Sequence, residues 1–291
     1  MFSVVIPTIG RTSLEELLNS IPSSPLLVSV IVVGDARMAT EQADAIAANL
    51  QLRTRFEIKW RRPVQPGVNA ARNLGIQEVA ADSRTEVLVF FDDDVVLSDF
   101  FSWEALRDVY KDAAVLAVGG NYISRDHLDF HARGYNLMCS GWRVASGYEK
   151  NEALLGGAWC IRLPEMLQVC RDLGWFEEDI LYGGAETPFM HRLRAWAAGN
   201  WSIVYNRHLD VFHHPRNRSL RDWLRIASTQ RRRLDEATMA ARPVHIVRLR
   251  RLFLFCLSLT IAELVTFFAF TIPFVVSGYV AALFSNVPKS R

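Results

Sequence analysis

Hydrophobic and polar positions divide the first 120 residues into two kinds of segment that alternate along the chain. Short apolar runs bounded by polar residues have the length and composition of buried strands. They are Ser3–Pro7, Val28–Val33, Glu57–Trp60 and Val87–Phe91. Between them, apolar residues recur at helical spacing in Ser13–Ser20, Thr40–Leu50 and Val68–Val79. Strands that alternate with helices predict an α/β domain with a mostly parallel sheet.

Polar or turn residues follow each of these strands. In order along the chain they are Pro7-Thr8, Asp35, Pro66-Gly67 and Asp92–Asp94. In open parallel sheets, ligands bind beyond the carboxyl ends of the strands. The sequence therefore predicts a binding site at that edge of the sheet, built by segments that lie far apart in the chain.

The rest of the chain has a different pattern. Residues 120–215 are less periodic and rich in Gly, Trp and Tyr, and we expect them to form a second half of the same domain. An Arg-rich helical pattern follows at Leu220–Ala240, and Leu252–Phe284 is apolar apart from Glu263, with Pro273 inside it.

The apolar run predicts a membrane segment. A bilayer core needs about 20 helical residues, so Leu264–Phe284 would span it once. Alternatively, Leu252–Thr271 and Pro273–Val287 form the arms of a hairpin with both basic flanks in the cytoplasm. Glu263 is costly in lipid, so we expect it at a helix partner or at the membrane interface.

Charge divides the chain in the same place. Residues 1–215 hold 20 Lys and Arg against 27 Asp and Glu, a balance of −7, whereas 216–251 hold 11 Arg against three acids, a balance of +8. A basic block next to an apolar run favours an anionic membrane surface as its partner, and not nucleic acid. The opening MFSVVIPTIG lacks the features of a signal peptide, so we expect the folded part in the cytoplasm.

The run Asp92-Asp93-Asp94 is the strongest chemical signal. A buried strand delivers three carboxylates to its end, where they need a counter-charge. A divalent cation (Mg²⁺ or Mn²⁺) held by oxygen ligands supplies one and keeps sites open for substrate phosphates. The alternative is a solvated acidic turn that caps the next helix.

A second signal is the helix start at Gly67–Gly75, where small residues and Arg72 suit an anionic group. Its alternative is an ordinary amphipathic helix.

Together these segments resemble family 2 glycosyltransferases of the GT-A fold, over roughly residues 2–235. The resemblance rests on an ordered set of short motifs. They are Val4-Val5-Ile6-Pro7-Thr8 with Arg11, Gly67 with Ala71-Arg72-Asn73-Leu74-Gly75, Phe91-Asp92-Asp93-Asp94, Gly156-Gly157-Ala158, Gly183-Gly184-Ala185-Glu186-Thr187 with Arg192-Leu193, and His213-His214-Pro215. It implies an α/β GT-A catalytic domain that uses a nucleotide-sugar donor (UDP-, GDP- or dTDP-sugar) and a divalent cation.

The resemblance also implies roles for individual residues. Donor or nucleotide binding falls to Pro7, Thr8, Arg11, Asp35, Arg72, Asp92 and Asp93. Asp94 and His214 would hold the metal, with His213 as the neighbouring candidate. The sequence departs from the family at Gly34-Asp35, where paired aspartates are usual, so the preferred base of the donor stays open.

The catalytic base is expected at Glu186. The family usually reads Glu-Asp-Thr where this chain has Ala185-Glu186-Thr187, so a carboxylate is kept and is one methylene longer. The alternative is that Glu186 is only a carboxylate at a helix start. For the acceptor, the candidates are Gly157, Trp159, Gln230 and Arg233, the last two in a run similar to the Gln-x-x-Arg-Trp box of processive members. A solvated basic helix and ordinary core packing are the alternatives for the arginine run and for Trp159.

These patterns divide the chain at residue 240. Residues 1–240 would form the GT-A domain, with a nucleotide-binding half (1–119), an acceptor half (120–215) and a basic helix (216–240), and 241–291 a membrane-associated segment. The expected reaction is inverting, metal-dependent sugar transfer to a lipid-linked or glycan acceptor at the cytoplasmic side of the inner (plasma) membrane. The alternatives are nucleotidyl transfer, or a decayed, membrane-anchored scaffold that binds a sugar nucleotide.

Overall fold

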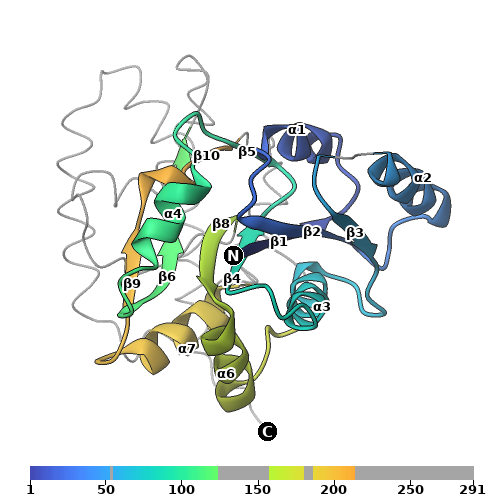
Figure 1. The fold of residues 1–291 in the computed structure, drawn as a ribbon. Helices are drawn as coiled ribbons and strands as arrows, with labels where there is room; N and C mark the ends of the chain where they lie inside the picture. The colour runs from blue at the N-terminus through green and yellow to red at the C-terminus, as the bar shows by residue number, and fades with distance from the viewer. Residues whose placement is uncertain (53–54, 124–156, 180–185, 214–291) are drawn as a thin grey trace, which may run out of the picture.

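The computed structural model describes residues 1–52, 55–123, 157–179 and 186–213 (Figure 1). Their strands form a seven-stranded sheet in the order β3-β2-β1-β4-β8-β6-β9 and a three-stranded sheet in the order β5-β10-β7. The predicted basic helix at 216–240 and the apolar run at 252–284 lie outside the described residues. Within those residues, no helix has the length and apolar character needed to cross a membrane.

The predicted strands and helices of the first 91 residues are confirmed, with ends that shift by at most one residue. The strands are β1 (Phe2–Thr8), β2 (Leu27–Gly34), β3 (Ile58–Arg61) and β4 (Val87–Phe91). The helices between them are α1 (Ser13–Ser20), α2 (Thr40–Gln51) and α3 (Val68–Ala80). β1 pairs in parallel with both β2 and β4, and β2 pairs in parallel with β3, as the alternating pattern predicts.

The second half of the chain extends the same sheet. Its strands are β6 (Val115–Gly119), β8 (Ala158–Arg162) and β9 (Ser202–Tyr205). β8 lies between β4 and β6 and is antiparallel to both, whereas β6 and β9 are parallel to each other. The sheet is therefore mostly parallel, with β8 reversed.

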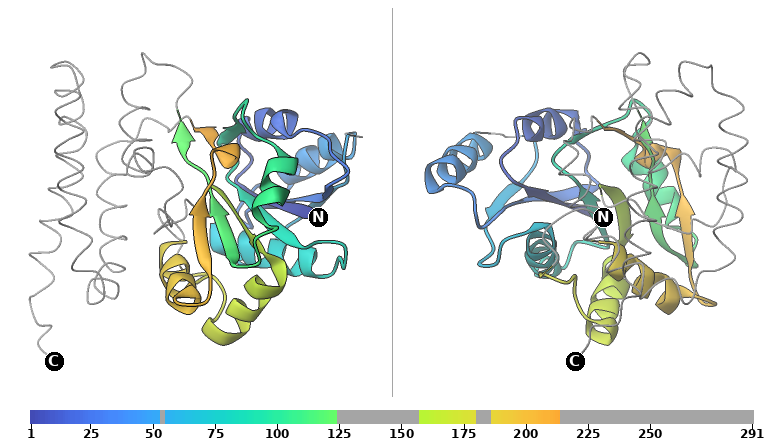
Figure 2. Two further views of the ribbon diagram at one scale, coloured as in Figure 1. Left: turned by 60° about the vertical axis from the view of Figure 1, so that its left-hand side comes forward. Right: turned by 180° about the vertical axis from the view of Figure 1, so that it is seen from behind.

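Helices cover both faces of this sheet (Figures 1 and 2). Side chains of alternate strand residues, such as Val4 and Ile6, pack with α1, α2 and α4 (Trp103–Val109) in one apolar core. Val5 and the other intervening residues pack with α3, α6 (Leu163–Leu173) and α7 (Thr187–Ala197) in a second core. The period-two alternation of strand side chains thus gives the sheet one apolar core on each face.

The small sheet continues from the end of β4. β5 (Val95–Leu97) follows Asp94 directly, and β10 (Val211–His213) pairs with it antiparallel, with His213 opposite Val95. β7 (Tyr122–Ile123) pairs with the other edge of β10. The short 3-10 helix η1 (Arg207–Leu209) leads into β10. This pairing brings the end of the described chain beside the acidic run.

Candidate active site

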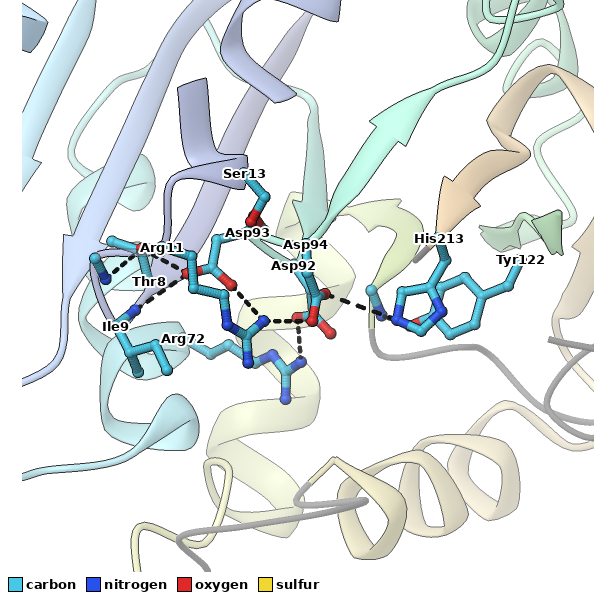
Figure 3. Close-up of polar contacts among 12 residues, drawn as sticks. Thr8, Ile9, Arg11, Ser13, Arg72, Asp92, Asp93, Asp94, Tyr122 and His213 are labelled. Carbon is cyan, nitrogen blue, oxygen red and sulfur yellow. Dashed lines mark hydrogen bonds and ion pairs between the residues drawn. The ribbon is translucent and has the colours of Figure 1, made fainter. Parts of the chain in front are cut away.

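The three consecutive aspartates occupy three different environments (Figure 3). The side chain of Asp93 is 5% exposed, whereas those of Asp92 and Asp94 are 30% and 22% exposed. The chain turns sharply here between the end of β4 and the start of β5, so the carboxylates point in different directions. Only the first and the third can reach a ligand.

Asp93 is engaged within the protein. Its carboxylate accepts hydrogen bonds from the Thr8 hydroxyl (2.6 Å), the Ile9 N–H (3.2 Å) and Arg11 Nη1 (2.8 Å), and the Ser13 hydroxyl donates to its carbonyl oxygen (2.6 Å). Burial raises the pKa of Asp93 above its ordinary value, although Arg11 and Thr8 favour the charged form. Asp93 therefore fixes the loop between β1 and α1. The donor contact that the sequence predicted for its carboxylate does not fit this arrangement.

Asp94 lies between a guanidinium and an imidazole. Arg11 Nη1 forms an ion pair with its Oδ2, and His213 Nε2 lies 3.9 Å from its Oδ1. The His213 ring is buried and stacks on Tyr122 with ring centroids 4.3 Å apart. Of the two histidines that the sequence left open, His213 is thus beside Asp94, and His214 lies outside the described residues.

Arg72 joins the acidic run to the candidate base. Its side chain is 2% exposed, its Nη2 donates to Asp92 Oδ1 at 3.0 Å, and its Nη1 lies 3.7 Å from Glu186 Oε2. A single buried guanidinium therefore holds two carboxylates that are 94 residues apart in the sequence.

Glu186 immediately precedes α7, in the position of its N-cap residue. Its side chain makes no capping hydrogen bond there and turns instead towards Arg72, with 22% of its surface exposed. The alternative, in which Glu186 serves only to cap the helix, would require a hydrogen bond from a backbone N–H of the first turn to its carboxylate, and that bond is not formed. Its charged partner is Arg72, which also binds Asp92.

The turn after β2 is held by Asp35. Its carboxylate accepts hydrogen bonds from the N–H and Nε of Arg37 and from Arg37 Nη2, all at 2.8 Å, and from the N–H of Gly67 at 2.9 Å. Burial disfavours the charged form, but these hydrogen bonds outweigh it and hold the pKa of Asp35 below its ordinary value. Four donors fill the lone-pair positions of a carboxylate. Asp35 therefore orders the turn and the start of α3, and direct recognition of the base by its oxygens does not fit this geometry.

The departure from the family at Gly34 has a steric reason. A Cβ on Gly34 would lie 2.5 Å from the Cη2 atom of Trp60. The indole of Trp60, on β3, thus occupies the space that a side chain at position 34 would need.

Gly157 packs directly against the acidic run. A Cβ there would lie 2.3 Å from the Tyr122 hydroxyl and 2.9 Å from Asp92 Oδ2, and the Gly157 N–H donates to the Tyr122 hydroxyl at 3.0 Å. Trp159, two residues later on β8, is fully buried and stacks on Phe90 at 4.5 Å between ring centroids. The predicted sugar contact of Trp159 does not fit this position, because the indole belongs to the core behind the sheet.

Gly157→Ala should lower the rate of the transfer reaction that the sequence predicts at least tenfold, because the new methyl group displaces Asp92 and Tyr122. Tenfold corresponds to about 1.4 kcal/mol. Steady-state kinetics would measure it. Adding Tyr122→Phe, which removes the hydroxyl closest to the methyl group, should restore part of the rate. A Gly157→Ala enzyme with the wild-type rate would show that Asp92 is not held by this contact.

Asp210 anchors the strand that carries His213. Its Oδ1 accepts from the Asn121 N–H at 2.7 Å and its Oδ2 from the Tyr205 hydroxyl at 2.8 Å. Burial raises its pKa to about 6, although these two hydrogen bonds favour the charged form. Between about pH 4 and pH 6 the unfolded chain has released this proton and the folded chain has not. The contribution of Asp210 to the free energy of unfolding therefore falls as the pH rises, by about 3 kcal/mol over that range.

Asp210→Asn should remove this pH dependence. Thermal unfolding midpoints of the two proteins should be similar near pH 4.5 and should diverge in favour of the variant by pH 7.5, because only wild type must bury a charge. A difference between variant and wild type that does not change with pH would contradict the assignment.

The described residues contain no group of three or more His, Cys, Asp or Glu side chains gathered as a metal site. A cation that is also bound by substrate phosphates needs only one or two ligands from the protein. The Asp94 carboxylate and the His213 imidazole are donors of the kinds that Mn²⁺ and Mg²⁺ accept, and they are 3.9 Å apart. The pair fits such a cation without a third protein ligand.

The amino-acid sequence matches the family model for glycosyl transferase family 2 over residues 3–167. This match spans more than half of the 291 residues, so the chain belongs to that family and is a glycosyltransferase. A comparison with curated protein sequences found no significant match.

Solved structures support the fold. The mannosyltransferase PcManGT from Pyrobaculum calidifontis, in complex with GDP-Man and Mn²⁺, is similar with a TM-score of 0.59 and 17% identity, covering 100% of this chain and 76% of that one. GalNAc-T7 with UDP, GalNAc and Mn²⁺ is similar with a TM-score of 0.54 and 15% identity, covering 79% of this chain and 47% of that one. At such identities the likeness establishes the GT-A-like fold alone.

The structure thus brings most of the predicted site together. Thr8, Arg11, Arg72, Asp92, Asp94 and Glu186 meet at the carboxyl ends of β1 and β4. Gln230 and Arg233 lie outside the described residues, as His214 does. Sequence reasoning gave no role to Tyr122, which carries no motif of its own and reaches the site only through the pairing of β7 with β10.

Proposed function

We propose that this glycosyltransferase transfers a sugar from a nucleotide-sugar donor to a membrane-linked or glycan acceptor, with inversion and with the help of a divalent cation. The observation that carries the proposal is the arrangement of Asp92 and Glu186 on either side of Arg72, with Asp94 close by. It provides carboxylates for a donor and, next to them, a separate carboxylate for a proton.

The donor side is supported by the charges of the site. Arg11 lies among the aspartates, and helix α3 begins at the same edge of the sheet, where the Gly67 N–H donates to Asp35. Positive groups at that edge of the sheet suit a diphosphate. The two similar structures hold GDP-Man or UDP together with Mn²⁺, which supports a nucleotide-sugar donor and a divalent cation here as well.

The cation would be held by Asp94 and His213 together with the donor phosphates. When bound, it supplies positive charge where the leaving diphosphate becomes more negative. Arg11, which already neutralises Asp93 and Asp94, adds fixed positive charge at the same place.

The reaction is a single displacement. Glu186 accepts the proton of an acceptor hydroxyl, and the oxygen forms a bond to the anomeric carbon on the face opposite the leaving group. The bond between that carbon and the diphosphate oxygen breaks, and its electron pair leaves with the nucleoside diphosphate. One displacement inverts the anomeric configuration.

The sequence beyond residue 213 supports the proposed acceptor and location. A block of 11 arginines at 216–251 leads into the apolar run at 252–284. Such a sequence favours the anionic cytoplasmic surface of the inner membrane, where lipid-linked sugars and growing surface glycans are presented. We therefore place the activity in the synthesis of a cell-surface polysaccharide or glycolipid.

A donor screen tests the proposal. The full chain is incubated with UDP-, GDP- and dTDP-sugars with Mn²⁺, with Mg²⁺ or with EDTA, and the released phosphorus species are identified. Release of a nucleoside diphosphate only with a cation supports the proposal. Pyrophosphate would indicate nucleotidyl transfer, and tight binding of a donor without turnover would indicate a scaffold; either result would overturn the proposal.

A further inference from the structure

Side chains of helix α3 contact both the acidic run and the segment on the other side of the site. Arg72 is buried and charged, and its guanidinium carbon lies 5.8 Å from the centre of the Phe176 ring. Its Nη1 also donates to Asn69 Oδ1, one turn earlier on the same helix, at 3.5 Å. The fork of the guanidinium thus has fixed partners on its own helix, on the acidic run and at Glu186.

Two buried asparagines on the same face of α3 bind the segment that leads towards Glu186. Asn73 Nδ2 donates to the Phe176 carbonyl oxygen and to Glu178 Oε1, both at 2.9 Å, and Asn73 Oδ1 accepts from the Phe176 N–H at 3.1 Å. Asn69 Nδ2 donates to the Glu177 carbonyl oxygen at 2.7 Å. These hydrogen bonds hold the segment firmly, because breaking them would leave buried amide groups unpaired at a cost in free energy.

Helix α7 holds the same segment from the other side. Phe176 stacks on Phe189, in the first turn of α7, with ring centroids 4.0 Å apart. Arg192, further along α7, forms an ion pair with Glu177 and donates to the Trp175 carbonyl oxygen at 3.0 Å. Residues 175–178 are therefore clamped between α3 and the helix that Glu186 begins.

We propose that α3 is a positioning element for the transfer reaction and that Arg72 is its positioning residue. Arg72 fixes the direction and the distance of the Glu186 carboxylate relative to Asp92, while Asn69 and Asn73 fix the segment behind it. The proposal rests on the proposed function, in which Glu186 takes the proton. It differs from the role that the sequence implied, in which Arg72 binds the donor itself.

The two roles differ in what a change at Arg72 does. The oxygen of a general base must lie within about 2.6–3.2 Å of the hydroxyl oxygen whose proton it takes, so a small displacement of Glu186 slows the chemical step. Lysine keeps the charge but is a point donor without a planar fork, so it cannot hold two carboxylates in the same geometry. Loss of a direct contact with the donor would instead weaken donor binding.

Arg72→Lys should therefore lower kcat for transfer about 100-fold, with the Kd of the nucleoside diphosphate product in the presence of Mn²⁺ changed less than about fivefold. Kinetics with the donor found in the screen and calorimetric titration of the product measure the two. A kcat close to wild type, or a fall in affinity as large as the fall in rate, would overturn the proposal.

Arg162→Lys is the matched control. Arg162 also donates through its guanidinium, to the carbonyl oxygens of Val115, Tyr110 and Asp112, at the far end of β8 from Gly157. Its change should lower the thermal midpoint and leave kcat and Kd as in wild type. An equal loss of kcat in this control would mean that the effect of Arg72→Lys is a general loss of stability.

Two further variants keep the test decisive. If Arg72→Lys does not fold, Asn73→Ser loosens the segment without changing charge and should lower kcat about tenfold with Kd unchanged. In a Glu186→Gln enzyme, adding Arg72→Lys should lower kcat only slightly further, because Arg72 acts through Glu186. If Glu186→Gln keeps the wild-type rate, the proposed function itself is wrong. If Glu186→Gln is much slower and the effects of the two changes on kcat multiply, only the positioning role is wrong.

Discussion

Glu186→Gln should lower sugar transfer by about 10²- to 10⁴-fold, which is the usual contribution of a general base. The amide cannot take the proton of the acceptor hydroxyl, yet it has nearly the shape of the carboxylate and can occupy the same place beside Arg72. Binding of the donor should change little, because Asp92, Asp94 and Arg11 are untouched. Transfer kinetics and calorimetric titration of the nucleoside diphosphate separate the two effects.

Two variants control this result. Glu104→Gln changes a glutamate near the start of a different helix, α4, and should leave the rate as in wild type. Glu186→Asp restores the residue type usual in the family and should keep a measurable share of the rate. Unchanged transfer by Glu186→Gln would mean that another group takes the proton.

The second large effect is expected at Asp94. Asp94→Asn should lower the rate about 10²- to 10³-fold, because it removes the charged ligand of the proposed cation, whose stabilisation of the leaving group is worth several kcal/mol. The concentration of Mn²⁺ that gives half of the maximal rate should also rise. A titration of the rate with Mn²⁺ measures both quantities.

Asp99→Asn is the control for this change. Asp99 lies five residues further on and is exposed, so its change should alter neither the rate nor the Mn²⁺ requirement. If Asp94→Asn lowers the rate but leaves the response to Mn²⁺ as in wild type, Asp94 does not bind the cation.

The sequence predicts the first half of the fold well because its information is local there. β4, for example, is an unbroken apolar run from Val87 to Phe91, and its ends agree with the prediction. β8 is different, since Ala158–Arg162 reads as an ordinary short apolar segment. Its antiparallel place between β4 and β6 depends on pairings with residues at least 40 positions away, which no local pattern encodes.

The candidate site was predictable as a set of residues but not as a set of contacts. The motifs name Asp92, Asp93 and Asp94 together, and only the structure shows that Asp93 is engaged with Thr8 and Arg11. The position of His213 depends on the pairing of β10 with β5, because its ring meets Asp94 across that pair. For Trp159 the stated alternative of core packing holds, since the face to which a strand residue points follows from register and not from its proximity to a motif.

The configuration of the sugar released from the donor tests the central claim most directly. If Glu186 assists a single displacement, water can take the place of the acceptor, and no acceptor has to be known. Proton NMR of a donor with α configuration, followed from the first minutes of slow hydrolysis with Mn²⁺, should show the β anomer of the free sugar before mutarotation. Initial release of the α anomer would show retention and would contradict a single displacement assisted by Glu186.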